Sequence, residues 1–209
     1  LFVVGMGLVC ALVDSRTGRR AQALAGSLQS ANQRLRELAF RDGLSGLPNR
    51  LHFEEQLDDT LARVGRQSAA MAVLFIDLDG FKAVNESFGH AAGDEVLREV
   101  GRRLAAQTRE QDSVARIGGD EFLLLYAEPG SQENTAALAQ QTLHALMAPY
   151  PLPTLAGGGS DVRLSCSIGI AMFPEHGPIS RLITNADAAM FAVKRTGGST
   201  YAFFDPRMG

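Results

Sequence analysis

Six consecutive apolar residues, Met71 to Ile76, constrain the fold of this chain more than any other segment. A strand exposed on one face alternates apolar and polar residues, whereas an unbroken apolar run of this length is typical of a strand buried on both faces. Such a strand needs helices on both sides of its sheet. Asp77 and Asp79 follow at the end of the run, where the strand leaves the core.

Helix and strand signals alternate around this run. Asn49 is a good helix cap, and the spacing predicts a helix from there to about Val64. The pattern predicts further helices at 80–88, 92–107, 131–148 and 180–195, and strands at 114–117, 122–126, 162–172 and 200–204. This alternation favours the α/β class, as a sandwich of helices around a central sheet.

A second acidic pair follows Gly118-Gly119, which is a hairpin signal between two predicted strands. Asp120 and Glu121 come directly after these glycines, where a backbone can approach a ligand closely. Asp77-Leu-Asp79 alone would also fit a strand-to-helix cap. If the hairpin lies beside the apolar strand, the carboxylates of both pairs converge, and a bound divalent cation would relieve their repulsion.

Composition narrows the range of partners. The net charge of −3 and the pI near 5.8 argue against a nucleic-acid surface, which would carry clustered Lys and Arg. Cys10 and Cys166 lie in apolar runs without metal-ligand or disulfide spacing, so we expect two reduced packing residues.

The first thirteen residues carry no charge. As a helix they would span about 20 Å, which is less than the roughly 30 Å hydrocarbon core of a bilayer. Arg16, Arg19 and Arg20 follow, as on the cytoplasmic side of a membrane span. We therefore expect residues 1–15 to be the end of a transmembrane helix of a longer protein, with a short buried helix as the alternative.

Residues 16–41 are predicted to form a helical linker. Apolar residues in a 4-3-4-3 spacing place one seam along it, as in a short parallel coiled coil, and these residues are Leu24, Leu28, Ala31, Leu35 and Leu38. The seam predicts a homodimer. The alternative is a single amphipathic helix that packs on its own domain.

The segment Arg116-Ile-Gly-Gly-Asp-Glu-Phe122 resembles the signature of the GGDEF family of diguanylate cyclases. Other segments resemble motifs of the same family, in the same order, over residues 42–205. They are Asp42-Gly-Leu-Ser-Gly-Leu-Pro-Asn-Arg50, with Ser45 where Thr is usual, Phe75-Ile-Asp-Leu-Asp-Gly-Phe-Lys-Ala-Val-Asn85, Gly89-His-Ala-Ala-Gly-Asp94, Ser167-Ile-Gly-Ile-Ala171 and Ala186-Asp-Ala-Ala-Met-Phe-Ala-Val-Lys194.

The resemblance implies a GGDEF domain at residues 42–209, with a mostly antiparallel sheet of the nucleotidyl-cyclase or polymerase-palm type preceded by an N-terminal helix. It implies that two GTP molecules condense across a homodimer into cyclic di-GMP and two pyrophosphates. Two Mg²⁺ or Mn²⁺ ions would be held by Asp77, the Leu78 carbonyl, Asp120 and Glu121. Asp120 would also be the candidate base for the ribose 3′-hydroxyl.

The same resemblance implies roles in substrate binding. Lys82 and Lys194 would contact phosphate, while Asn85 and Asp94 would bind the guanine edge. His90 would line the guanine pocket, although a histidine in an ordinary turn is the alternative.

An RxxD arrangement, Arg109 to Asp112, resembles the family's inhibitory site for its product, with a surface pair at a helix end as the alternative. Arg116 would either join that site or face the sheet. Many members have Gly-Arg-Asn where this chain has Gly197-Gly198-Ser199. The missing arginine would weaken triphosphate binding by about 1–2 kcal/mol.

The tail, residues 203–208, resembles the junction to an EAL-type phosphodiesterase domain. The resemblance thus implies a bacterial inner-membrane signalling protein whose GGDEF domain lies in the cytoplasm. The alternative function is a regulatory domain that binds GTP or cyclic di-GMP with weak or no catalysis and controls an attached phosphodiesterase.

Overall fold

The structure is a computed structural model that describes residues 22, 24–32, 34–36, 39–64, 70–152 and 160–208. Its contacts divide the chain into two units, Leu1–Ala39 and Phe40–Gly209. The described residues of the first unit are helical. Leu24, Leu28 and Leu35 are exposed there, while Leu38 and the predicted membrane segment 1–15 lie outside the described residues. No helix within the described part of the chain has the length and hydropathy needed to cross a bilayer.

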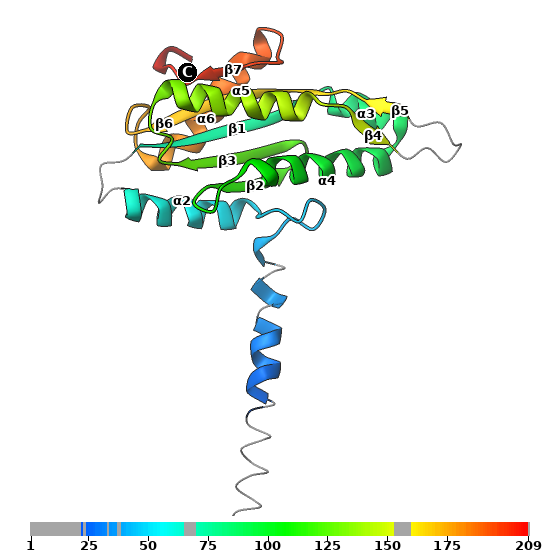
Figure 1. The fold of residues 1–209 in the computed structure, drawn as a ribbon, viewed down its shortest axis with the longest axis vertical. Helices are drawn as coiled ribbons and strands as arrows, with labels where there is room; N and C mark the ends of the chain where they lie inside the picture. The colour runs from blue at the N-terminus through cyan, green and yellow to red at the C-terminus, as the bar shows by residue number, and fades with distance from the viewer. Residues whose placement is uncertain are drawn as a thin grey trace, which may run out of the picture. The chain divides into compact units, whose positions relative to one another are not determined.

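The second unit contains helices and strands in alternation. In chain order they are α2 (Arg50–Val64), β1 (Met71–Asp79), α3 (Phe81–Phe88), α4 (His90–Gln107), β2 (Ser113–Gly118), β3 (Glu121–Ala127), α5 (Gln132–Met147), β4 (Tyr150–Leu152), β5 (Ser160–Val162), β6 (Ser165–Phe173), α6 (Ile179–Arg195), β7 (Tyr201–Phe203) and the 3₁₀ turn η1 (Pro206–Met208). Figure 1 shows these elements around one sheet.

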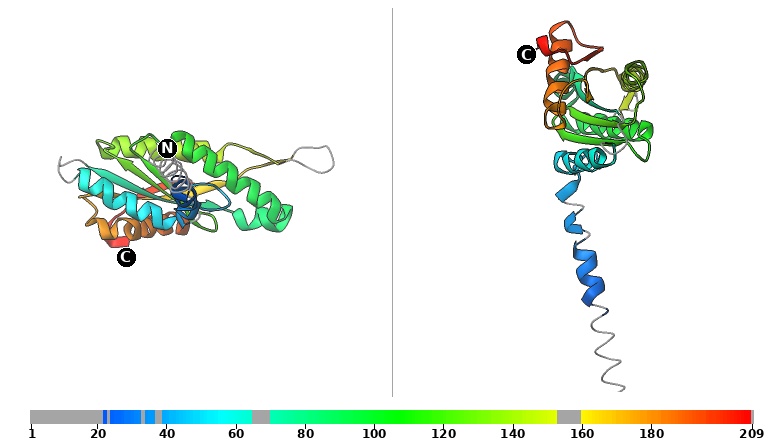
Figure 2. Two further views of the ribbon diagram at one scale, coloured as in Figure 1. Left: turned by 90° about the horizontal axis from the view of Figure 1, so that it is seen from below. Right: turned by 90° about the vertical axis from the view of Figure 1, so that its left-hand side faces the viewer.

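The main sheet has the order β2-β3-β1-β6-β7 and is antiparallel except between β6 and β7. Seen from the side in Figure 2, α4 and α5 lie on one face of the sheet and α6 lies on the other. The predicted α/β sandwich with a central, mostly antiparallel sheet is therefore confirmed. β1 is its central strand.

Alternate residues of β1 enter two separate cores, as expected for a strand buried on both faces. Leu74 and Ile76 pack with α4 and α5, whereas Val73 and Phe75 pack with α2 and α6. By the same alternation the Asp77 side chain lies on the face that α6 covers. Cys166, in the first core, is a free buried thiol as predicted, and Cys10 lies outside the described residues.

Residues 162–172 differ from the single strand expected there. They are divided between β5 and β6, and β5 pairs with β4 in a separate two-stranded sheet with Tyr150 opposite Val162. The sequence pattern could not reveal this hairpin, because strands of three residues are too short to show a period. The other predicted elements agree with the structure to within a few residues.

α6 lies directly on the sheet because β6 has a glycine beneath it. A Cβ atom added at Gly169 would stand 1.9 Å from the Ala186 carbonyl oxygen and 2.2 Å from the Met190 amide nitrogen. The helix backbone therefore occupies the space of a side chain. This close contact sets the height of α6, and thus of Lys194, above the sheet.

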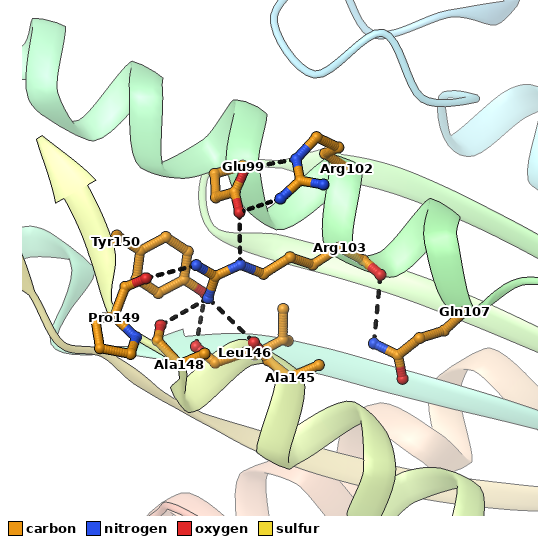
Figure 3. A network of polar contacts seen from close by, with 9 residues as sticks. All are labelled: Glu99, Arg102, Arg103, Gln107, Ala145, Leu146, Ala148, Pro149 and Tyr150. Atoms are coloured by element: carbon orange, nitrogen blue, oxygen red, sulfur yellow. Dashed lines mark hydrogen bonds and ion pairs between the residues drawn. The ribbon is translucent and has the colours of Figure 1, made fainter.

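Arg103 joins α4 to the end of α5 (Figure 3). Its guanidinium donates to the carbonyls of Ala145, Ala148 and Pro149 and bonds the Glu99 carboxylate at 2.8 Å. It also lies 4.0 Å from the centre of the Tyr150 ring. Carbonyls at a helix end have no partner within the helix, so Arg103 supplies donors that the α5 terminus lacks.

We expect Arg103→Met to lower the free energy of unfolding by about 2–4 kcal/mol, because it leaves several half-buried acceptors without a donor. Urea denaturation of the isolated domain measures this change. Arg102→Met is the matched control, since Arg102 also bonds Glu99 but its side chain is 70% exposed; its effect should stay below about 1 kcal/mol. Equal effects of the two substitutions would contradict the role of Arg103.

Candidate active site

The acidic residues of the hairpin lie beside those at the end of β1. Asp77 is directly opposite Glu121 across the β1–β3 pair, and the Leu78 amide donates to the Asp120 carbonyl at 3.2 Å. The turn between β2 and β3 needs its glycines, since Gly119 has φ +48°, a left-handed conformation that other residues rarely adopt. The structure therefore brings Asp77, Asp120 and Glu121, three of the four acids expected to converge, to the same end of the sheet.

Burial and neighbouring negative charges raise the pKa of two carboxylates in this group, Asp77 and Glu121. Burial raises the pKa of Asp77, and the charges of Asp120 and Asp79 add to that rise, while Lys194 opposes it. Burial also raises the pKa of Glu121, with contributions from Asp77, Asp187 and Asp120. Asp187, on α6, was not predicted from the sequence as a site residue, although it stands two helical turns before Lys194. A negative field of this kind attracts cations.

Lys194 reaches into the site from α6. Its Nζ atom lies 2.5 Å from Asp77 Oδ1 as an ion pair, which agrees with the predicted place of Lys194 in the site. Apart from this ammonium, the buried Asp77 Oδ1 atom has no hydrogen-bond donor among the described residues.

These donors fit a hard divalent cation that is shared with a substrate. A cationic ammonium group already lies at Asp77 Oδ1, and Glu121 beside it is partly exposed. Within the described part of the chain, no group of three or more Asp, Glu, His or Cys side chains is placed to hold a metal ion by itself. Mg²⁺ commonly takes one or two carboxylates and completes its shell with substrate phosphates and water, which matches this arrangement.

Asp79 does not join the other carboxylates as a free acceptor. Both of its oxygens accept hydrogen bonds, from the hydroxyls of Ser165 and Ser167 and from the Ser199 amide, at 2.8–2.9 Å. The sequence had suggested one convergent set of four acids. The tertiary structure divides it, because the loop after α6 covers Asp79.

The residues expected to bind guanine come from two adjacent helices. Asn85 on α3 packs against α4, where a Cβ atom at Gly93 would overlap the Asn85 side-chain oxygen. This places Asn85 beside the turn of α4 that carries Asp94, and both side chains are half-buried. His90 is exposed at the start of α4, and the Lys82 side chain is 90% exposed with Glu86 at 3.7 Å.

Arg116 joins the turn of the hairpin to the loop that precedes α2. Its guanidinium donates to the Gly119 carbonyl and to Asp42 Oδ1, the latter at 2.9 Å. The Ser45 hydroxyl and amide also donate to Asp42 Oδ1, so the hydroxyl of Ser45 supplies the bond where Thr is usual. These two partners of Arg116 were not among the expectations from sequence, and a contribution of Arg116 to the RxxD surface stays a prediction. The one hint in the sequence was that Asp42 and Arg116 each begin a motif of the same family, which suggests but does not establish that the two residues meet.

The RxxD residues lie on the turn between α4 and β2. Asp112 accepts hydrogen bonds from the Arg109 backbone amide at 3.2 Å and from the Ala127 amide at 3.0 Å. The Arg109 side chain is exposed. Asp112 therefore braces the turn and the end of β3, while the Arg109 guanidinium faces solvent.

Comparison with known protein families and curated relatives gives a match over most of this chain. The family model described as "Diguanylate cyclase, GGDEF domain" matches residues 39–200. The chain is 42% identical over its whole length to the bifunctional diguanylate cyclase/cyclic di-GMP phosphodiesterase MucR of Pseudomonas aeruginosa, of which it covers 30%.

Solved structures agree with this match. The GGDEF domain of TpbB from Pseudomonas aeruginosa has a TM-score of 0.75 and 39% identity, covering 80% of this chain and 96% of that one. The GGDEF domain of DgcB from Caulobacter crescentus, solved in complex with cyclic di-GMP, has a TM-score of 0.71 and 26% identity, covering 79% and 93%. The chain spans 30–38% of the length of the curated relatives MucR and TpbB.

The repulsion among the carboxylates predicts that Glu121→Gln stabilises the metal-free domain at pH 7. A raised pKa means that the folded state holds its proton more tightly than the unfolded chain, so the stability falls as the pH rises through the interval between the unfolded and folded pKa values. Removing one charge should raise the free energy of unfolding by up to about 1 kcal/mol, or about 2–4 °C in Tm.

Thermal unfolding with and without Mn²⁺ measures this effect. Mn²⁺ should raise the Tm of the unmodified domain more than that of Glu121→Gln. Glu128→Gln is the matched control because Glu128 is exposed just beyond the other end of β3, and it should change neither quantity. A destabilised Glu121→Gln with an unchanged response to Mn²⁺ would refute the proposed charge repulsion.

Proposed function

Because this chain belongs to the GGDEF-domain family, we propose that its second unit is a diguanylate cyclase that condenses two GTP molecules into cyclic di-GMP and two pyrophosphates. The observation that carries the proposal is the meeting of Asp77, Asp120 and Glu121 with Lys194 at the end of β1. These groups combine the acidic oxygens and the ammonium that phosphoryl transfer between nucleotides requires.

Asp77, the Leu78 carbonyl, Asp120 and Glu121 would hold two Mg²⁺ or Mn²⁺ ions. When bound, these ions would spread the negative charge of the triphosphate and lower the pKa of the ribose hydroxyl. Asp120 would accept the proton of the ribose 3′-hydroxyl. The hydroxyl oxygen would then form a bond to the α-phosphorus of the other GTP, while the bond from that phosphorus to pyrophosphate breaks. Lys194 would leave Asp77 to contact a phosphate oxygen, since an ammonium serves both partners equally well.

The guanine base would lie between α3 and α4. Asn85 and Asp94 match the O6 acceptor and the N1 and N2 donors of guanine, and their half-burial strengthens such hydrogen bonds. His90 and Lys82 would lie at the exposed end of this pocket, with Lys82 free to exchange Glu86 for a phosphate because that ion pair is solvated.

Each site would hold one GTP, so the reaction needs a second chain. The exposed leucines of the first unit, Leu24, Leu28 and Leu35, are the surface that would pair two linkers and set the effective concentration of the two half-sites. Residues 1–15 would continue a membrane helix of a longer inner-membrane protein, with residues 16–41 as the linker and residues 42–209 as the cytoplasmic cyclase domain.

A second candidate function is a regulatory domain that binds GTP or cyclic di-GMP and controls an attached phosphodiesterase. Gly198, where many members have arginine, favours it, because the site has one basic phosphate contact fewer. The name of MucR, which joins both activities, makes an attached phosphodiesterase domain plausible for this chain as well. The intact acidic group favours the cyclase.

Incubation of the full chain with GTP and Mg²⁺, followed by chromatography of the products, tests the cyclase. We expect cyclic di-GMP and pyrophosphate in a 1:2 ratio, and Asp120→Asn should reduce the rate by at least about 100-fold, since it removes the base. GTP that is bound but never consumed would instead support the regulatory domain.

The same assay, repeated at several protein concentrations, tests whether the reaction needs a dimer. The rate per chain should rise with concentration, and Leu28→Asp with Leu35→Asp should shift that rise to higher concentrations. Glu133→Gln, on the exposed surface of α5, should leave the curve unchanged. A rate per chain that is independent of concentration in all variants would contradict a shared active site.

The product should inhibit the enzyme at the turn that carries Arg109 and Asp112. We expect Arg109→Ala to raise the half-inhibitory concentration of cyclic di-GMP by about tenfold or more, because a charge-assisted contact is lost. The initial rate measured without added product should stay the same. Arg98→Ala, on the exposed face of α4, is the matched control, and equal inhibition of both variants would exclude this site.

A further inference from the structure

The carboxylate of Asp79 is the centre of a second polar cluster next to the proposed active site. Asp79 is the last residue of β1, two residues after Asp77, so both side chains lie on the same face of the strand. Ser165 donates to one oxygen of Asp79 and Ser167 donates to the other. Neither hydroxyl is charged, so the negative charge of Asp79 is held by hydrogen bonds alone.

The third donor belongs to the loop that follows α6. The Ser199 amide donates to Asp79 Oδ2 at 2.9 Å, and the Ser199 hydroxyl donates to the Ser165 hydroxyl at 2.5 Å. We call Asp79, Ser165, Ser167 and Ser199 the Asp79 clamp. It ties the end of β1, the start of β6 and the loop between α6 and β7 to one carboxylate.

The backbone of this loop touches the carboxylate itself. Gly198 has φ +74°, and a Cβ atom added there would lie 2.9 Å from Asp79 Oδ2. Any larger residue would have to push the loop and the Asp79 carboxylate apart, and it would also be strained in this conformation. An arginine at position 198 would therefore disturb the clamp, which gives a structural reason for the glycine at this position.

The clamp also fixes the C-terminus of α6. The Gly197 amide donates to the Lys194 carbonyl and the Gly198 amide donates to the Val193 carbonyl, which is the Schellman arrangement of a helix end. Lys194 is thus hydrogen-bonded through its backbone to the loop that Asp79 holds. Its ammonium group meets Asp77 on the same strand, two residues before the clamp.

We infer that Asp79 is a positioning residue that, through the loop at 197–199, holds Lys194 at the phosphate side of the site and does not itself bind the metal ions. This inference rests on the proposed function of the site as a GTP site. The clamp fastens the helix end that carries Lys194, one of the two lysines proposed to contact phosphate, in a chain that lacks the arginine of many relatives.

Binding of GTP, measured by calorimetry with Mg²⁺ present, tests the inference in a double-mutant cycle. We expect Lys194→Ala and Asp79→Ala each to weaken GTP binding by about tenfold, the size of one charge-assisted contact. The double variant should bind no more weakly than Lys194→Ala alone, because Asp79 acts through that lysine. Additive losses would overturn the inference.

The Mg²⁺ dependence of GTP binding distinguishes positioning from direct metal binding. In Asp79→Ala the Mg²⁺ concentration for half-maximal binding should stay within about twofold of that of the unmodified chain. A tenfold rise would identify Asp79 as a metal ligand and overturn the inference. Asp161→Ala is the matched control, since Asp161 and Asp79 line the same cavity of about 570 Å³; it should leave GTP binding unchanged.

A second variant keeps the test valid if Asp79→Ala does not fold. Gly198→Ala retains every polar group of the clamp but pushes the loop away from Asp79, so it should also weaken GTP binding, with no further loss when combined with Lys194→Ala. Full GTP affinity in Gly198→Ala would contradict the inference. An unmodified chain that binds GTP but forms no cyclic di-GMP would refute the proposed cyclase function and leave this test valid. An unmodified chain that binds no GTP would overturn the inference itself.

Discussion

The burial of β1 on both faces is the constraint on which the rest of the second unit depends. Its alternate side chains enter two cores, one with α4 and α5 and one with α2 and α6. No exposed edge is left to β1, because β3 and β6 pair along nearly its full length. The one place where polar groups of β1 can meet water is its C-terminal end, and Asp77 stands there, between the β2–β3 hairpin and the end of α6.

Two carboxylates that are two residues apart on this strand have acquired different surroundings. Asp77 has like charges nearby, and the ammonium of Lys194 is the one cation that contacts its Oδ1 atom among the described residues. Asp79 has three hydrogen-bond donors and no free oxygen. Unsatisfied negative charge favours binding of a cation, whereas satisfied charge favours rigidity. Asp77, with like charges around it, is therefore suited to bind a cation. Asp79, with its hydrogen bonds satisfied, holds the neighbouring backbone in place. Arg116 supports the other side of the site in the same way, by joining Asp42 to the turn of the hairpin.

Much of this arrangement could be predicted because local patterns dictate it. The apolar run of β1, the helix caps and the glycine turn before Asp120 are all readable within a few residues. The position of the hairpin beside β1 was only a condition at the level of sequence, and the antiparallel β1–β3 pair supplies it. The β4–β5 hairpin could not be predicted, since its strands are three residues long. The hydrogen-bond partners of Asp79 lie 86–120 residues away along the chain, and Asp42 lies 74 residues from Arg116. No local pattern encodes such pairings.

The sequence by itself determined the family, the alternation of helices and strands and the identity of the acidic and basic groups, because each depends on residue type and short spacing. Tertiary structure alone decided which groups share a task. It paired Asp77 with Lys194 and Glu121, and it took Asp79 out of that set, because the loop after α6 donates a hydrogen bond to Asp79 and none to Asp77. The physical reason is that the charge and hydrogen bonding of a carboxylate depend on which donors packing brings within about 3 Å, and packing is set by the whole chain.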